Sequence, residues 1–502
     1  MQRHAILIFS HNPLENLVPI IEYFDNEFDL FIHYDKRISL DEEELNAFLT
    51  KYPHIRFYRR YRFKWGGIPI VKAELKLLSI ILDTDSYAYI HIISDSDRPI
   101  KSLSEFKSFF DKNKGKEYVG CFPLPDRRWE NGTFGRFELF RLNDLFNYRS
   151  KLGKFIIDLA NDLQQKLNVR RSDRSLCSNL YGGSTWMSIT AQCAAHIVAN
   201  QTKYRPFFKR LRFTFGADEV FLQTMIMNSP FSAKVVFDDC RYTKWRQGSP
   251  SPEWLTMKDC FDVATSQKVF ARKFHPTKSA SLWEWIGHNL ISMGTPKIGD
   301  HGQWLSYDYS GHVFDGGLAE CIFEIVSQND METVVDMGCG PGWYVAYLRR
   351  LGIRAYGYDA NPHTDTISTH LFKSNYHCEC LDLSEEVIFS KPFELVISIE
   401  VGEHIPKEFQ NTFLDNLANN CSNCLLLSWA VPEQAGDGHI NLKTNEWVID
   451  QITQRGLIFN REKTILYRSK CNHNWLKKSL MFFERVPTGI KLFCDGKPRY
   501  NR

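Results

Sequence analysis

Two carboxylates one residue apart, Asp95 and Asp97, directly follow an apolar run in the first half of the sequence. Carboxylates at positions i and i+2 of a loop can hold a divalent cation that bridges a diphosphate. Aspartate is also common in solvated turns, where it accepts hydrogen bonds from backbone N–H groups. The pair therefore indicates either a diphosphate site or an ordinary turn.

A glycine-rich segment in the second half has the composition of a nucleotide-binding turn. Gly338, Gly340 and Gly342 come after an apolar run that ends near Asp336. Glycines at such a turn let the backbone approach a bound nucleotide closely. The dinucleotide fingerprint would need glycine at position 343, where this chain has tryptophan. Asp359 follows Gly338 by 21 residues, near the roughly 20 expected of a carboxylate that accepts from ribose hydroxyls.

Alternating strands and helices must position the first group of residues. Apolar runs at 5–9, 30–33 and 87–93 predict buried strands, and helical spacing of apolar residues between them predicts helices. We expect Asn12 to cap the first helix. This alternation indicates an α/β fold with a mostly parallel sheet, whose ligands bind beyond the carboxyl ends of the strands. One rim is therefore expected to carry 10–12, 35 and 95–97.

The length of 502 residues predicts two or three domains at roughly 100–200 residues each. Hydrophobic residues make up 43% and aromatic residues 14% of the chain, which excludes a disordered protein. A glycine-containing stretch at 276–303 lacks a clear period, and we place a boundary there, giving domains at 1–290 and 291–502. The net charge of +3 does not indicate nucleic-acid binding.

The sequence also bears on localisation. No apolar run reaches the roughly 18 residues of a membrane span, and the N-terminus leads directly into a predicted strand, so we expect no signal peptide. The thirteen cysteines are scattered and odd in number, which favours free thiols. We therefore expect a cytoplasmic protein.

An ordered set of motifs in the first half resembles the core-2/I-branching β-1,6-N-acetylglucosaminyltransferase family, which includes protein xylosyltransferases. The resemblance spans roughly 3–280, and its motifs lie at 4–13, 31–36, 65–67, 93–100, 182–186, 215–221 and 270–274. It implies a GT-A-type domain with a mixed sheet and an inverting transfer of a sugar from a UDP-sugar to a hydroxyl.

The same resemblance implies roles for individual residues. Glu219 occupies the place of the general base that deprotonates the acceptor hydroxyl; alternatively, it only complements the dipole of the helix that follows. Lys273 with Arg272, and more loosely Arg246, would neutralise the leaving diphosphate without a metal. The family commonly has other residues at positions 95 and 96, so metal binding by the aspartate pair stays an alternative.

Further residues are assigned to the donor and acceptor. Asp35 is expected to meet the uridine or its ribose. Trp65 and Trp186 are expected either to stack on a sugar or to belong to the core. The predicted donor site comprises Ser10, Asp35, Asp95, Asp97, Arg246, Arg272 and Lys273.

The second half resembles class I S-adenosylmethionine-dependent methyltransferases, which implies a Rossmann-like domain. The glycine-rich turn corresponds to their first motif, Asp359 to the ribose ligand and Asp382 to the adenine ligand. The predicted cofactor site comprises Asp336, Gly338, Gly340, Gly342, Asp359 and Asp382.

Methylation of an alcohol needs a base, and a histidine with a pKa near neutrality suits this role. His404 is the first candidate and His439 the second, although either can be a structural residue. Glu400, Glu403 and His404 resemble a divalent-metal cluster of some O-methyltransferases.

We therefore predict a bifunctional enzyme that transfers N-acetylglucosamine or xylose to a glycan and methylates a hydroxyl, plausibly of the same glycan. Two alternatives stay open. The first domain could be an inactive glycan-docking module, or the methyltransferase could act on an unrelated small molecule, lipid or protein. The expected partner is a glycan, with peripheral association to membrane-linked glycan assembly as a further expectation.

Overall fold

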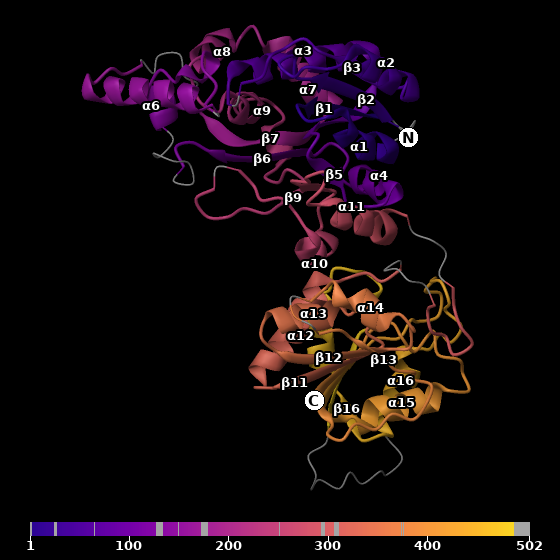
Figure 1. Ribbon diagram of the computed structural model, residues 1–502. Coiled ribbons are helices and arrows are strands. Elements are labelled where there is room, and N and C mark those ends of the chain that lie inside the picture. The colour runs from indigo at the N-terminus through magenta and orange to yellow at the C-terminus, as the bar shows by residue number, and fades with distance from the viewer. Residues whose placement is uncertain are drawn as a thin grey trace. The chain divides into compact units, whose positions relative to one another are not determined.

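The computed structural model describes residues 3–24, 28–64, 66–126, 134–148, 150–171, 179–249, 251–292, 297–305, 311–372, 374 and 376–485. The chain divides into two compact units (Figure 1). Unit 1 comprises Met1–Leu255 and Gln267–Ala280, and unit 2 comprises Thr256–Ser266 and Ser281–Arg502. Within the described ranges, no helix combines the length and the apolar character that crossing a membrane requires.

A seven-stranded mixed sheet forms the centre of unit 1, with the strand order β3-β2-β1-β4-β7-β6-β8. The first four strands in this order run parallel, whereas β7 runs antiparallel to both β4 and β6. The strands are β1 (Arg3–Ser10), β2 (Phe28–Tyr34), β3 (Arg56–Tyr58), β4 (Tyr87–Ser94), β6 (Glu117–Pro123), β7 (Tyr181–Thr190) and β8 (Val235–Val236).

Helices cover both faces of this sheet. Successive side chains of a strand point to opposite sides, and in β1 both sets are apolar and buried, so each face needs a covering layer. Ala5, Leu7 and Phe9 of β1 pack in one core with α3, α7 and α9, and Ile6 and Ile8 pack in a second core with α1 and α4. The helices are α1 (Val18–Phe24), α2 (Glu42–Lys51), α3 (Ile68–Thr84), α4 (Leu103–Lys112), α5 (Phe134–Glu138), α6 (Lys151–Lys166), α7 (Ala191–Asn200), α8 (Arg205–Leu211) and α9 (Phe221–Met227).

A small three-stranded sheet lies beyond the end of β4. It consists of β5 (Asp97–Pro99), β10 (Phe270–Arg272) and β9 (Arg241–Thr243), in the order β5-β10-β9. The antiparallel pairing of β10 with β5 places Arg272 opposite Asp97. The parallel pairing of β10 with β9 places Thr243 on the other side of Arg272. Residues from three distant parts of the sequence therefore lie side by side in this small sheet.

The prediction that Asn12 caps the first helix is wrong. The chain instead forms a short 3-10 turn at Leu14–Asn16, with Pro13 at its N-cap, and α1 begins at Val18. The Asn12 amide donates a hydrogen bond of 2.9 Å to Asp95 Oδ1. The Asn12 side chain therefore binds a residue that is distant in the sequence and does not cap the helix.

Unit 2 is built on a second seven-stranded sheet with the order β13-β12-β11-β14-β15-β17-β16. Its first five strands are parallel, and β17 runs antiparallel to β15 and β16. The strand order reverses between β11 and β14, and ligands of open α/β sheets bind at such a switch point. The strands are β11 (Thr333–Met337), β12 (Arg354–Asp359), β13 (Glu379–Cys380), β14 (Phe393–Ser398), β15 (Cys421–Leu427), β16 (Leu457–Phe459) and β17 (Met481–Arg485).

Helices again cover both faces of the sheet. One core contains α12, α13 and α17, and the other contains α15 and α16 around the buried Trp429. The helices are α12 (Gly316–Gln328), α13 (Trp343–Arg350), α14 (Thr364–Thr369), α15 (Gln410–Asn419), α16 (Asn445–Thr453), α17 (Arg461–Lys470) and α18 (Leu476–Ser479). Two further helices, α10 (Cys260–Ala264) and α11 (Ala280–Ile286), lie where the chain passes from one unit to the other. This doubly covered sheet is Rossmann-like, as predicted.

Candidate functional site

The carboxyl ends of β1, β2 and β4 meet at one rim of the first sheet. The backbone N–H of Asp35 donates to the carbonyl of Ser10 at 2.9 Å, and that of Asp95 donates to the carbonyl of Phe9 at 3.1 Å. The start of β7 reaches the same rim, because Met187 of β7 pairs with Ile92 near the end of β4. The structure thus brings the predicted donor-site residues of three loops together.

Asp95 is saturated with hydrogen bonds from the loop that follows β1. Its Oδ2 accepts from Ser10 Oγ at 2.7 Å and from the backbone N–H groups of His11 and Asn12 at 3.0 Å each. Its Oδ1 accepts from the Asn12 amide. The carboxylate therefore ties two loops together, and a cation could bind it only by displacing these donors.

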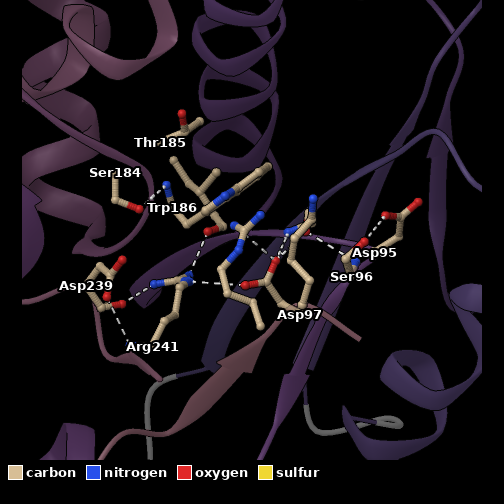
Figure 2. A network of polar contacts seen from close by, with 12 residues as sticks. Asp95, Ser96, Asp97, Ser184, Thr185, Trp186, Asp239 and Arg241 are labelled. Carbon is tan, nitrogen blue, oxygen red and sulfur yellow. Dashed lines mark hydrogen bonds and ion pairs between the residues drawn. The ribbon is translucent and has the colours of Figure 1, made fainter. Parts of the chain in front are cut away.

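Asp97 is fully buried and faces two arginines (Figure 2). Arg241 Nε lies 3.5 Å from Asp97 Oδ1, and Arg272 Nη1 lies 3.7 Å from Oδ2. The other partner of the carboxylate is Ser94, whose backbone N–H donates to Oδ2 at 2.7 Å. Two cations next to one carboxylate repel a metal ion, so this donor set does not fit the alternative of a metal held by the aspartate pair.

The arginine cluster keeps unused hydrogen-bonding groups. Within the described part of the chain, Arg241 Nε, Arg272 Nε, Arg272 Nη1 and Asp97 Oδ1 are buried without a hydrogen-bond partner. Burial also lowers the pKa of Arg272. Buried polar groups are rarely left unpaired, and an exception can mark a ligand site.

Trp186 lies against this cluster. The Arg272 guanidinium sits 4.8 Å from the centroid of its ring, a cation–π geometry. The guanidinium therefore covers one face of the Trp186 ring, so a sugar could stack only on the opposite face. Trp65, the second predicted stacking residue, lies outside the described residues.

Asp35 is occupied by internal donors. Arg37 binds its Oδ2 through Nη2 at 2.6 Å and Nε at 2.9 Å, and the backbone N–H groups of Arg37 and Phe63 donate to Oδ1 at 2.9 and 3.1 Å. The carboxylate holds the loop after β2 against residue 63. A ribose hydroxyl would have to share these oxygens.

Lys273 and Arg246 lie on neighbouring loops but differ in their surroundings. Lys273 Nζ donates to Ser251 Oγ at 2.8 Å and lies 4.8 Å from the ring centroid of Trp254. Arg246 is exposed, and its Nε lies 4.0 Å from Glu253. A hydrogen bond and an aromatic ring therefore fix the Lys273 side chain next to Arg272, whereas the exposed Arg246 side chain has only a long ion pair.

Glu219 ends a 3-10 turn, Ala217–Glu219, that Gly216 introduces with φ of 78°. Its Oε2 lies 2.7 Å from Arg136 Nη1, and its side chain is 40% exposed. A Cβ at Gly216 would lie 2.5 Å from Arg136 Nη1 and 2.9 Å from Glu219 Oε2, so only glycine leaves room for this ion pair. The carboxylate is accessible and oriented.

The neighbouring Asp218 connects this turn to the arginine cluster. Thr185, which precedes Trp186 in β7, donates to Asp218 Oδ2 at 3.0 Å. Burial, together with the adjacent Glu219 carboxylate, raises the pKa of Asp218 to about 7. The turn of Glu219 and the ring beside Arg272 therefore belong to one edge of the sheet.

Sequence reasoning missed Arg136, Asp218 and Arg241. Asp218 directly precedes Glu219 in the sequence, and this adjacency was the one signal that could have predicted its place at the site. Arg136 and Arg241 lie 83 and 144 residues from their carboxylate partners, and no local pattern connects them.

Unit 2 contains a cavity of about 410 Å³ at its topological switch point. The loops after β11, β12 and β14 line it, together with residues 301–304 and 311–313. Seven of the predicted site residues lie on its wall: Asp336, Gly338, Gly340, Asp359, Asp382, Glu400 and His404.

The glycine-rich turn has the backbone that its sequence predicts. Gly338, Gly340 and Gly342 all have positive φ, at 85°, 51° and 92°. A Cβ at Gly338 would lie 2.4 Å from Val401, and the Gly340 N–H donates to Asp359 Oδ2 at 2.8 Å. Glycine is needed for both conformation and close approach.

Two acidic residues at the cavity differ in their electrostatics. Burial, together with the nearby Asp359, raises the pKa of Asp336 well above its usual range. Burial also acts on Asp382, but hydrogen bonds from His301 and Ser384 outweigh it and lower its pKa. His301 Nδ1 lies 2.6 Å from Asp382. The cavity is also lined by His301, Trp304 and His312. These residues are not predicted from the sequence, in which the segment up to 303 is treated as a domain boundary and the residues that follow have no assigned role.

Two histidines and a glutamate form a compact group at the cavity. One ligand atom each from Glu403, His404 and His439 lies within 4.8 Å of the others. Glu403 is fully buried, and within the described ranges neither of its carboxylate oxygens has a hydrogen-bond partner. Burial raises its pKa well above the usual range.

The structure adds His439 to the predicted Glu403 and His404 as a candidate third ligand, and Glu400 contributes to the raised pKa of Glu403. The Glu400 carboxylate accepts hydrogen bonds from Gln434 and Ser479. Burial, with His439 nearby, lowers the pKa of His404 to about 4, so its imidazole is neutral at physiological pH. His404 Nδ1 lies 3.1 Å from the Gly438 carbonyl, which fixes Nδ1 as the protonated nitrogen and leaves Nε2 as an acceptor.

Comparison with known proteins matches each half. The profile of the Core-2/I-Branching enzyme family matches residues 5–265, and that of a methyltransferase domain matches residues 316–449. Xylosyltransferase oxt of Drosophila melanogaster is 23% identical over 57% of this chain and 33% of its own length. Xylosyltransferase 2 of Rattus norvegicus is 23% identical over 55% of this chain and 32% of its own length. The chain thus spans about a third of the length of these relatives.

Solved methyltransferase structures align with about a third of the chain. Magnesium protoporphyrin IX methyltransferase from Synechocystis PCC 6803 with bound SAM is 18% identical, with a TM-score of 0.25, over 34% of this chain and 78% of its own. N-methyltransferase NodS from Bradyrhizobium japonicum WM9 is 16% identical, with a TM-score of 0.28, over 34% and 86%. The chain belongs to the core-2/I-branching enzyme family and carries a methyltransferase domain in its C-terminal half.

Proposed function

We propose that unit 1 transfers a sugar from a UDP-sugar to a glycan hydroxyl with inversion. The arginine pair at Asp97 carries this proposal, because it places buried N–H groups that form no hydrogen bond among the described residues at the strand ends where a nucleotide would bind. Arg241, Arg272 and Lys273 would neutralise the charge that develops on the leaving diphosphate. The likeness to xylosyltransferases supports xylose as the sugar, with N-acetylglucosamine as the other candidate.

Glu219 is the general base in this proposal. Its carboxylate is accessible, and Arg136 holds it in one orientation. A carboxylate so placed can take the acceptor proton as the oxygen attacks the anomeric carbon, and the bond to the diphosphate breaks on the opposite side. Asp95 and Asp97 hold loops and arginines, so the transfer needs no divalent metal.

Release of UDP from a panel of UDP-sugars tests this activity. We expect consumption of UDP-xylose or UDP-N-acetylglucosamine in the presence of glycan, unchanged by EDTA, and its loss in Glu219→Gln. Stimulation by manganese after chelation would contradict the metal-free mechanism. If the wild-type protein consumes no donor but binds glycan, unit 1 is a docking module.

We propose that unit 2 binds S-adenosylmethionine in its cavity and methylates a hydroxyl. Asp359 would accept from the ribose hydroxyls, Asp382 would contact the adenine amine, and the glycine-rich turn would lie against the cofactor. His404, whose Nε2 can accept a hydrogen bond, is the first candidate to take the hydroxyl proton, but its pKa of about 4 lies below the near-neutral value expected from the sequence and makes it a weak base. His439 is the second candidate for this role.

The group of Glu403, His404 and His439 also fits a divalent cation. A buried carboxylate that has no hydrogen-bond partner among the described residues, with His439 Nε2 3.9 Å from its Oε1 and His404 beside it, is a donor set that transition metals prefer. A bound ion would supply Lewis acidity that lowers the pKa of a substrate hydroxyl. Without the ion, His404 and His439 remain the two candidates for the base.

The two activities are proposed to act on one glycan. Incubation with labelled S-adenosylmethionine, the active UDP-sugar and total cell glycan should give a product that carries both labels. The methyltransferase should act faster on the product of unit 1 than on the unmodified acceptor. Equal rates on both would separate the activities and favour an unrelated methyl acceptor.

We also propose a reducing compartment for the protein, as in the cytoplasm. The eleven cysteines in the described ranges are free thiols, and all except Cys380 are buried. Such cysteine usage is typical of chains that do not rely on disulfides.

A further inference from the structure

Helix α6 (Lys151–Lys166) and its C-terminal extension present a stripe of large apolar side chains to solvent. Leu152, Phe155, Leu159, Leu163 and Leu167 are between 47% and 73% exposed. Their spacing of three or four residues places them along one strip of the helix surface. The strip that faces the body of unit 1 carries Gly153, Ile157 and Asn161, which are buried. The apolar stripe is therefore a second face, separate from the one that anchors the helix.

Neighbouring residues extend this stripe into a patch. Phe140, Leu145 and Val169 are also exposed, which brings the number of exposed large apolar residues between 140 and 169 to eight. In Figure 1, α6 projects from the edge of unit 1, away from α1 and α2. A stripe of exposed apolar side chains along one helix, with further exposed apolar residues in the adjoining segments, is typical of an interaction surface. We call these eight residues the α6 patch.

Basic residues surround the α6 patch. The exposed basic residues here are Lys151, Lys154 and Lys166 on α6 and Lys203, Arg205, Lys209 and Arg212 in segment 203–212, although the whole chain has a net charge of only +3. The two segments are joined, since Arg171 donates to the backbone carbonyls of Arg212 and Phe213 at 2.8 and 2.7 Å. Exposed positive charge therefore lies on both segments beside the α6 patch.

The distribution of charge along α6 disfavours pairing with a second copy of the helix. Lysines lie at both ends, at 151, 154 and 166, and acids lie near the middle, at 158 and 162. In an antiparallel pair whose two-fold axis passes through the middle of the helix, the acids would meet acids and the end lysines would meet lysines, which is unfavourable. An anionic surface, in contrast, is attracted by the lysines at both ends of α6 and by the exposed Lys203, Arg205, Lys209 and Arg212.

We propose that the α6 patch docks unit 1 on an anionic phospholipid surface, with α6 lying in the plane of the interface. Leucine and phenylalanine would enter the boundary between headgroups and acyl chains, and the lysines would contact the headgroup phosphates. This inference goes beyond the sugar and methyl transfer proposed above. It gives the enzyme a way to meet acceptors that are attached to lipid.

Vesicle sedimentation of the full chain tests this proposal. We expect binding to vesicles of phosphatidylcholine mixed equally with phosphatidylglycerol, weaker binding to phosphatidylcholine alone, and a decrease with added salt. Replacing Phe155, Leu159 and Leu163 by serine should lower the partition coefficient at least about tenfold. Replacing Lys151, Lys154 and Lys166 by glutamine should lower binding to the anionic vesicles only.

A matched control replaces Ile465 and Leu466 by serine, since both are exposed apolar residues on α17. This variant should bind vesicles like the wild type. Circular dichroism verifies that every variant is folded. The proposal is overturned if the serine variant of α6 binds vesicles as the wild type does. It is equally overturned if the wild type is a dimer that this variant converts to a monomer while vesicles bind neither.

Discussion

Arg136 Nη1 lies 2.7 Å from Glu219 Oε2, and this ion pair orients the one carboxylate of the turn that is open to an acceptor. Arg136 also lies 5.2 Å from the ring centroid of Phe215, so its own position is supported. The pair is part of the proposed reaction centre and has little to do with stability, because partly exposed ion pairs contribute only about 0–1 kcal/mol.

Arg136→Gln should therefore lower kcat for sugar transfer about tenfold or more, with a smaller change in KM. Steady-state kinetics with the active donor measures this split, and thermal unfolding should show a shift of only a few degrees. Arg170→Gln serves as the control, because Arg170 forms a longer and more exposed pair with Glu138 at 3.9 Å. Equal loss of kcat in both variants would contradict a positioning role for Arg136.

Asp97→Asn should destabilise unit 1 by about 3–5 kcal/mol, since it leaves two buried guanidinium groups without their counterion. Urea unfolding measures the loss. Asp85→Asn removes an exposed carboxylate 3.9 Å from Arg3 and should cost less than about 1 kcal/mol. UDP should raise the melting temperature of Asp97→Asn more than that of the wild type, because its diphosphate would replace the lost charge. An equal effect of UDP on both proteins would place the diphosphate elsewhere.

Gly338→Ala should reduce the affinity of unit 2 for S-adenosylhomocysteine at least about tenfold, because the new methyl group meets Val401 and the residue keeps a strained φ. Gly352→Ala separates these causes, since Gly352 has φ of 87° but open space around its Cβ position. That control should lose about 1 kcal/mol of stability and no affinity. Isothermal titration and thermal unfolding give the two readouts, and normal affinity in Gly338→Ala would disprove the role of the turn.

Glu403→Gln should weaken binding of manganese or zinc by at least about tenfold, because it removes the one carboxylate of the group. In the presence of EDTA the variant should be at least as stable as the wild type, since glutamine has the same shape and no charge to bury. Titration with each metal alone provides the measurement, and the exposed Glu408→Gln is the control. Unchanged metal affinity in Glu403→Gln would exclude this group as the site.

Acid should destabilise the protein through its buried histidines. Burial lowers the pKa of His33 to about 4, whereas an unfolded histidine titrates near 6.5. The stability that the neutral ring contributes is complete above about pH 6.5 and is lost as the pH falls towards 4. His33→Gln should make the decline of the unfolding free energy from pH 7 to 4.5 shallower by up to about 3 kcal/mol. Parallel profiles for the two proteins would refute this assignment.

Much of the fold and part of each site follow from local sequence. Apolar runs and helical spacing predicted the strands β1, β2, β4 and β11 because burial on both faces leaves a direct trace in composition. The positive φ angles at 338, 340 and 342 were equally readable, since glycine tolerates them best. Asn12 shows the limit of prediction from local sequence. Its side chain binds Asp95, which is 83 residues away, and does not cap the helix as expected.

The sequence by itself determined the two folds, the order of the motifs and the acidic residues at the strand ends. Only the tertiary structure decided which of those acids are available. Asp95 and Asp35 are saturated by neighbouring loops, and Asp97 is neutralised by Arg241 and Arg272. Glu403 has no hydrogen-bond partner among the described residues and lies 3.9 Å from His439. The physical reason is that hydrogen-bond saturation and desolvation depend on atoms from distant parts of the chain, which no spacing along the sequence encodes.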